Sequence, residues 1–237
     1  PDMGRTYRRI AEHGVEDFYE GAIAREIDAD MRANAALLTL EDLRQYGTVD
    51  AQPLWGEYRG HRIATNQLPG GGAMVLEMLN ILEYFDLRSM GHNSPDYVAT
   101  VAEAMKIATV EKDEHFGDPR FVDVPLERLL SREHASNMAE RIRAGEKTHV
   151  PRLNRGADNK DTTHVCAVDD RGNCVSMTHS LGNPSGVVTD GLGFMYNGCM
   201  NVFDPRPGRA DSIAPGKSRF TAMSPTLVFR DGRPYLV

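Results

Sequence analysis

Apolar residues recur every three or four positions through much of the first 145 residues, the spacing of one helix face. This pattern predicts helices over residues 17–27, 73–85, 95–114 and 132–144. N-capping residues mark two helix starts, Thr39 for the segment 39–43 and Ser94, followed by Pro95, for the third of these helices. The helix 73–85 is expected to be mostly buried, because its polar stripe is confined to Glu77, Asn80 and Glu83.

Alternation of apolar and polar residues is typical of strands, and it dominates the chain after residue 161. It predicts two hairpins, over 55–65 with a turn at Arg59-Gly60 and over 163–180 with a turn at Asp169–Gly172. Further strand signals follow in residues 186–202, 226–229 and 235–237.

Two segments lack any periodicity and predict loops, residues 145–161 and 204–218, both rich in glycine, proline and polar residues. Pro69–Gly72 precedes a helix but lacks the Walker and dinucleotide-binding patterns, so it is interpreted as a tight turn. Helices first and strands second predict an α+β fold.

Composition narrows the classes of function. The 237 residues are 41% hydrophobic and 26% charged, as in ordinary globular proteins. A net charge of −7 argues against nucleic-acid binding, and no apolar run reaches membrane-spanning length. Because the chain starts at Pro1 without a methionine and stops at Val237 inside a predicted strand, we expect a piece of a longer protein, truncated at both ends. The compartment is left open, and a homo-oligomer is compatible with the sequence.

Metal and cofactor chemistry has no sequence motif here. Cys166, Cys174 and Cys199 are an odd number without metal-like spacing, which predicts buried thiols; a disulfide between the first two stays open. The eight histidines are scattered, and neither H-E-x-x-H nor C-x-x-C occurs, so no metal and no cofactor is assigned. The absence of G-x-S-x-G argues against a serine hydrolase of that type.

Thr162 is the candidate nucleophile. A polar loop ends at Asp161, and the chain then runs through Thr162, Thr163 and His164 into a predicted strand. A threonine hydroxyl becomes a useful nucleophile when its own α-amino group acts as the base, which requires cleavage of the preceding peptide bond. A loop that can be cut, followed by a strand that holds the threonine, suits this chemistry, although Thr-Thr also begins many ordinary strands.

A succession of motifs resembles the γ-glutamyltranspeptidase family over nearly the whole chain. The first part carries FYEG (18–21), LTLEDL (38–43), LWGEYRG (54–60), GGG (70–72) leading into MLNILE (78–83), EAM (103–105) and GDPRFV (117–122) with Val124-Pro125. The second part carries TTH (162–164), D-x-x-G-N (169–173) and MSPT (223–226). Each motif is loose alone, but their common order is specific.

The resemblance implies a partial N-terminal-nucleophile (Ntn) hydrolase fold, a four-layer αββα sandwich made by a self-cleaving precursor. Cleavage between Asp161 and Thr162 would leave residues 1–161 as part of a large subunit and 162–237 as part of a small subunit, intertwined in one domain. Thr162 would then hold a γ-glutamyl or similar acyl group as an ester and pass it to water or an amine. Ser180, at a position where the family usually has threonine, would assist the cleavage.

Departures from the family pattern fall on the substrate site. The family implies substrate-binding roles for Gly182 or its neighbour Asn183, where many members have asparagine at the first position, and for Thr221, which keeps one hydroxyl of a serine pair. Val202 stands where an aspartate grips the substrate α-amino group, and Asp204 is the nearest possible substitute. A buried charge without its partner is costly, so we expect poor use of glutathione or a different acyl donor.

Three interpretations follow. The first is a γ-glutamyltranspeptidase-like enzyme acting on a small γ-glutamyl substrate, the second a related amidase acting on another acyl amide, and the third a non-catalytic binding relative. The family's oxyanion-hole glycine pair is expected beyond Val237, and its carboxylate-binding arginine before Pro1. The 237 residues alone are therefore not expected to form a competent enzyme.

Overall fold

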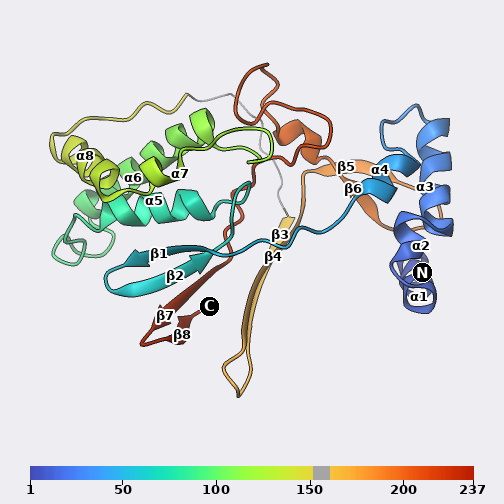
Figure 1. The fold of residues 1–237 in the computed structure, drawn as a ribbon, viewed down its shortest axis with the longest axis horizontal. Coiled ribbons are helices and arrows are strands. Elements are labelled where there is room, and N and C mark those ends of the chain that lie inside the picture. Colours follow the sequence, from blue (N-terminus) through green and yellow to red (C-terminus); the bar gives the residue numbers. More distant parts are fainter. Residues whose placement is uncertain (152–160) are drawn as a thin grey trace. The chain divides into compact units, whose positions relative to one another are not determined.

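The computed structural model describes residues 1–151 and 161–237 and has the predicted α+β composition. Its helices precede most of its strands, and the chain divides into two compact units (Figure 1). The first unit comprises residues 1–50 and 181–199, and the second comprises residues 51–180 and 200–237. Each unit therefore draws residues from both sides of position 161.

The first unit packs four helices and a two-stranded sheet around a small core. Its elements are α1 (Asp2–His13), α2 (Glu16–Tyr19), α3 (Ala22–Ala33), α4 (Leu40–Gln45), β5 (Pro184–Val188) and β6 (Met195–Asn197). Its buried side chains are Ile23, Ala24, Ile27, Met31, Leu43 and Leu192. Thr6 donates a hydrogen bond to the Leu192 carbonyl at 2.8 Å and so joins α1 to the segment between the two strands.

One predicted helix in this unit is wrong. The periodicity of residues 17–27 predicts one continuous helix, but α2 ends at Tyr19 and α3 begins at Ala22. The Asp17 carboxylate accepts a hydrogen bond from the Ala22 amide at 2.6 Å, which caps the new helix start. A side chain at Gly21 would come within 2.6 Å of the Asp17 backbone, so glycine is needed at the break. The N-cap predicted at Thr39 is confirmed, and Asp42 completes it as a capping box.

The second unit contains an antiparallel four-stranded sheet in the order β1-β2-β7-β8. Its strands are β1 (Leu54–Tyr58), β2 (His61–Thr65), β7 (Thr226–Arg230) and β8 (Arg233–Leu236). The hairpin predicted over 55–65 is confirmed, and the strands predicted over 226–229 and 235–237 correspond to the paired strands β7 and β8. The pairing of β2 with β7, in which Ile63 lies opposite Val228, joins segments more than 150 residues apart and could not be read from either hairpin.

Helices lie over one face of this sheet (Figure 1). They are α5 (Gly72–Leu82), α6 (Pro95–His115), α7 (Leu126–Leu129) and α8 (Arg132–Arg143). Their buried core consists of Ile81, Leu82, Phe85, Ala104, Ile107, Ala135 and Ala139. The helix predicted over 73–85 ends at Leu82, and its polar stripe is not a surface feature throughout, because Glu77 is fully buried.

The backbone of the glycine turn before α5 packs directly against the backbone of residues 221–223. Gly71 donates to the Met223 carbonyl at 2.9 Å, and Thr221 donates to the Pro69 carbonyl at 2.9 Å. A side chain at Gly71 would lie 2.7 Å from the Ala222 carbonyl oxygen. Glycine therefore serves close approach here, in agreement with the predicted tight turn.

Asp118 of the GDPR motif ties the loop after α6 to the segment before β7. Its carboxylate accepts hydrogen bonds from the Arg120 guanidinium at 2.6 Å and from the Ser218 amide at 2.9 Å. The Arg120 bond is the main reason why the pKa of Asp118 falls to about 2, although burial opposes the shift. Among the described residues, no helix is long and apolar enough to cross a membrane.

Candidate active site on the β3–β4 ribbon

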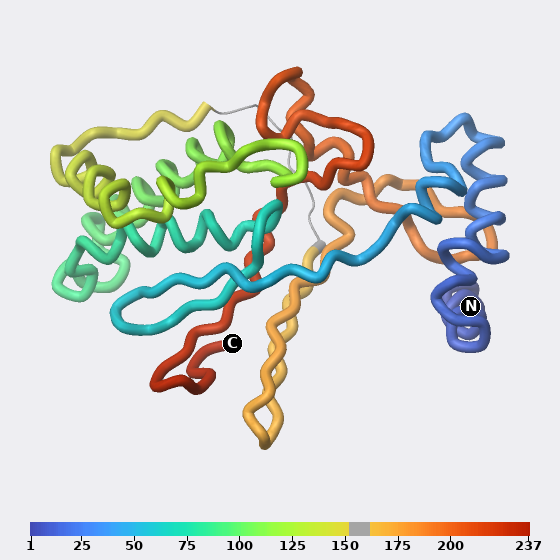
Figure 2. The backbone as a smooth tube through the Cα atoms, viewed as in Figure 1, coloured from blue at the N-terminus to red at the C-terminus, as the bar shows by residue number. Residues whose placement is uncertain are grey.

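Thr162 lies at the start of a long two-stranded ribbon formed by β3 (Asp161–Val168) and β4 (Cys174–Gly182) (Figure 2). The hairpin predicted over 163–180 is thus confirmed. The turn is closed by Asp169, whose carboxylate accepts hydrogen bonds from the amides of Arg171 at 2.9 Å and Asn173 at 2.8 Å. Of the loop predicted over 145–161, residues 152–160 lie outside the described residues.

The ribbon brings the two predicted hydroxyls together. Thr162 Oγ1 and Ser180 Oγ are 2.9 Å apart, a hydrogen-bond distance across a separation of eighteen residues in the chain. Thr162 is exposed and Ser180 is half-buried. The proton can be donated from either side, so the serine can polarise the threonine hydroxyl or accept its hydrogen.

His164 is the residue whose role the sequence did not reveal. Its Nδ1 lies 2.8 Å from the Thr178 hydroxyl and its Nε2 lies 3.2 Å from the Ser176 hydroxyl, so the imidazole bridges β3 and β4. Because side chains alternate along a strand, His164 shares a face with Thr162, and Thr178 shares one with Ser180. The signal that could have found it is this alternation of polar side chains on both strands.

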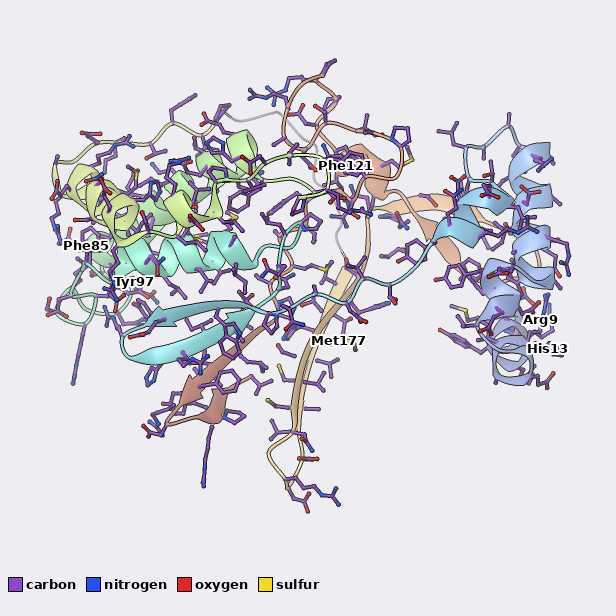
Figure 3. All side chains as sticks on the ribbon, viewed as in Figure 1. Arg9, His13, Phe85, Tyr97, Phe121 and Met177 are labelled. Carbon is purple, nitrogen blue, oxygen red and sulfur yellow. The ribbon has the colours of Figure 1, made fainter. Side chains whose placement is uncertain are left out.

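The opposite face of the ribbon is exposed and carries three large apolar side chains beside Thr163 and His179. It carries Val165, Val175 and Met177, each roughly half exposed; Met177 is labelled in Figure 3. The prediction of buried thiols is wrong, because Cys166 is exposed and Cys174 and Cys199 are half-buried. Cys166 and Cys174 lie on the same face of the ribbon as Thr162 and Ser180, which is only partly covered. Each cysteine keeps its thiol.

Gly182 is the last residue of β4 and Asn183 follows it, and both belong to the first compact unit. The backbone at Gly182 has φ 68°, a left-handed conformation that glycine and asparagine adopt most readily. Glycine can therefore replace asparagine here at little backbone cost, while the side-chain amide is lost. The Asn183 carbonyl accepts a hydrogen bond from the Gly198 amide at 2.6 Å.

Thr221 and the residues near Val202 lie on other segments of the second unit. The Thr221 hydroxyl accepts a hydrogen bond from the Met223 amide at 3.3 Å, a local turn contact. Val202 ends a short 3-10 helix, Cys199–Val202. The Asp204 carboxylate already has cationic partners. Arg206 binds it at 2.6 Å and lowers its pKa to about 2, and Arg209 lies 3.9 Å away.

Comparison with known proteins identifies relatives that match the whole chain or nearly all of it. The family model for gamma-glutamyltranspeptidase matches residues 1–237. The chain is 34% identical to a glutathione hydrolase proenzyme of Escherichia coli (strain K12), over 100% of this chain and 44% of that protein. It is 37% identical to the Acylase ACY 1 proenzyme of Pseudomonas sp. (strain V22), over 98% of this chain and 42% of that protein.

The fold agrees with that sequence similarity. The crystal structure of a cephalosporin acylase from Bacillus halodurans matches with a TM-score of 0.83 and 28% identity, covering 98% of this chain and 42% of that one. The chain thus spans less than half the length of these relatives. The predicted α+β fold of the Ntn-hydrolase type is confirmed, and the chain belongs to the gamma-glutamyltranspeptidase family.

Proposed function

We propose that the full-length protein is an autoprocessing hydrolase or acyltransferase that uses Thr162 as its nucleophile. The observation that carries the proposal is the 2.9 Å contact between the hydroxyls of Thr162 and Ser180 at the beginning of β3. An exposed threonine held by a neighbouring strand is accessible to both a peptide carbonyl and a substrate. Residues 1–161 would supply part of a large subunit, and residues 162–237 part of a small subunit from the same precursor.

Self-cleavage would begin when Thr162 Oγ1 attacks the carbonyl carbon of Asp161. The hydroxyl proton leaves through Ser180, the C–N bond breaks, and the Thr162 nitrogen takes up a proton to become a free amine. The backbone carbonyl group of Asp161 is then held as an ester on Thr162 Oγ1, and water hydrolyses this ester. Ser180 suits this role because its oxygen already lies within hydrogen-bond distance of the attacking atom.

The same hydroxyl would then act on a substrate amide. The new α-amine of Thr162 accepts the hydroxyl proton as Oγ1 attacks the amide carbonyl carbon. The C–N bond of the amide then breaks, the α-ammonium returns the proton to the leaving amine, and the acyl group stays on Oγ1 as an ester. Water or a second amine accepts the acyl group and restores Thr162. Substrate-binding roles are proposed for Thr221, Gly182 and Asn183, as the family pattern implies.

The test is intact-mass spectrometry of the full-length protein beside Thr162→Ala, with Thr163→Ala as the matched control on the opposite face of the strand. Wild type and Thr163→Ala are expected to split between Asp161 and Thr162, whereas Thr162→Ala stays whole. A wild-type protein that remains intact under native conditions contradicts the proposal and favours a non-catalytic binding relative.

A second candidate function differs in the acyl donor. Val202 offers no carboxylate for a substrate α-amino group, and Asp204 is already bound to Arg206 at 2.6 Å. The acylase names of two relatives fit a donor without that amino group. We therefore infer, as the second candidate, an amidase that acts on an acyl amide without an α-amino group rather than on glutathione.

Two substrates that differ only in the amino group supply that test. γ-Glutamyl anilide and glutaryl anilide carry the same acyl chain with and without the α-amine. The wild-type enzyme is expected to favour glutaryl anilide, and Val202→Asp is expected to shift the ratio toward γ-glutamyl anilide. Efficient turnover of glutathione by the wild type would contradict this choice of donor and leave the Thr162 nucleophile intact.

A further inference from the structure

Three potential metal ligands meet between the helices, and none of them is assigned to catalysis by the sequence. They are Glu77 on α5, Glu111 on α6 and His134 on α8. Each offers one ligand atom, and these atoms all lie within 4.8 Å of one another. Because the three residues come from three separate helices, no spacing motif marks them in the sequence.

Burial makes this cluster unusual. The Glu77 side chain is 0% exposed and that of His134 is 7% exposed. Glu77 Oε1 lies 3.0 Å from His134 Nε2, but its second oxygen, Oε2, is buried without a hydrogen-bond partner. A buried polar atom without a partner is costly, and in native proteins it usually has an ion or water to explain it.

The charges around Glu77 are incompletely balanced. Burial raises the pKa of the Glu77 carboxyl above its usual range, while the His134 contact opposes that rise. Glu111 adds a second carboxylate, and Arg128 lies 3.3 Å from Glu111 Oε2. His115 Nε2 approaches the same oxygen at 3.4 Å. Arg128 is half exposed, so its contact with Glu111 lies toward the solvent side of the cluster.

We propose that Glu77, Glu111 and His134 bind a structural divalent transition-metal ion, with Zn²⁺ the best match to their donors. Two carboxylates and one imidazole form a set of donors that Zn²⁺ accepts. The ion would replace the proton between His134 Nε2 and Glu77 and would give Oε2 a partner. Water fills the fourth position.

The geometry requires only small adjustments. Donors about 2.1 Å from a tetrahedral ion lie about 3.4 Å apart. Atoms within 4.8 Å of one another therefore close on an ion by modest side-chain rotation. Such a site would tie α5, α6 and α8 together, and binding of the ion would add to the stability of the folded helical layer.

The test measures Zn²⁺ binding to the full-length protein after removal of metals with a chelator. Wild type is expected to bind one equivalent at this site and to unfold at a higher temperature with Zn²⁺ than without it. Glu77→Gln keeps the shape of the side chain but removes its charge, and it is expected to weaken Zn²⁺ binding at least about tenfold and to abolish the thermal shift.

Two control variants locate the ion. Glu127→Gln removes an exposed carboxylate on neighbouring α7 and is expected to leave Zn²⁺ binding unchanged. Glu114→Gln removes a carboxylate from a second potential cluster, formed by Glu111, Glu114 and His115 on α6. This variant is also expected to leave Zn²⁺ binding unchanged. The proposal is overturned if wild type binds no Zn²⁺, if Glu77→Gln binds as tightly, or if only Glu114→Gln loses affinity. A circular dichroism spectrum of metal-free Glu77→Gln shows whether the variant is folded.

Discussion

Two polar pairs in the second unit have opposite surroundings. Glu77 and His134 meet at 3.0 Å inside the helical layer and are almost completely buried. Thr162 and Ser180 meet at 2.9 Å on the β3–β4 ribbon, where Thr162 is exposed. The lengths of the two contacts are nearly equal, so length alone does not tell what each pair contributes.

The difference in burial separates stability from chemistry. A buried ionisable group whose partner is removed is left without solvation, so each member of the helical pair holds the other in place. A hydroxyl on the ribbon can exchange its partner for water at little cost, and its contact adds little to folding. The buried pair is therefore expected to stabilise the fold, and the exposed pair to be retained for reactivity.

The largest effect is expected for His134→Ala in metal-free protein. Leaving the buried Glu77 carboxylate without its partner should lower the free energy of unfolding by about 3 kcal/mol or more. Thr162→Ala should change it by no more than about 0.5 kcal/mol. Urea denaturation of both full-length variants measures the contrast, and equal losses would remove the distinction between the pairs.

Ser180→Ala tests the exposed pair by rate instead of stability. Without the neighbouring hydroxyl, self-cleavage at Asp161–Thr162 should slow about a hundredfold, a typical effect of losing a group that transfers a proton. Ser180→Thr restores a hydroxyl and should cleave at a rate near wild type. The appearance of the two fragments is followed by mass spectrometry over time, and an unchanged rate in Ser180→Ala would assign that serine a structural role only.

Asp118 is a buried carboxylate paired with the exposed Arg120 side chain, and the effect of this pair depends on pH. Its pKa is about 2 in the folded protein against 3.8 for the free side chain, so folding favours the ionised form. The resulting stabilisation, up to about 2 kcal/mol, is present above about pH 5 and is lost as the pH falls toward 2.

Asp118→Asn should lower the unfolding free energy at pH 7 by about 2 kcal/mol and flatten its dependence on pH between 5 and 2. Denaturation midpoints of both proteins across this range give the measurement. A variant as stable as wild type at pH 7 would show that the contacts to Arg120 and Ser218 contribute nothing net.

Among the contacts expected to stabilise the fold, the smallest effect is expected for an exposed pair of purely local origin. Thr39 and Asp42 form a capping box at the start of α4, with hydrogen bonds of 3.2 Å and 2.8 Å. Thr39→Ala should lower the free energy of unfolding by about 1 kcal/mol, less than His134→Ala or Asp118→Asn. Thr39→Ser keeps the cap and should lose little. A larger loss in Thr39→Ser than in Thr39→Ala would contradict the capping explanation.

Local features of the chain predicted much of the fold correctly. The caps at Thr39 and Ser94, the hairpin at Arg59-Gly60 and the ribbon around Asp169 all depend on neighbouring residues, and each is confirmed. The helix over 17–27 failed for a local reason too, since Asp17 caps a second start that periodicity cannot detect. The order of the motifs was enough to indicate the family.

Features that join distant segments were beyond such reasoning. The pairing of β2 with β7, the burial of Glu77 against His134 and the anchoring of Ser218 by Asp118 each link residues from 57 to more than 150 positions apart. The sequence separation of eighteen residues between Thr162 and Ser180 did not indicate their distance in space, which the register of the ribbon determines. Caps and turns follow from the nearest few residues, whereas burial and the pairing of distant side chains depend on how all the elements pack, because desolvation is a property of the whole surrounding structure.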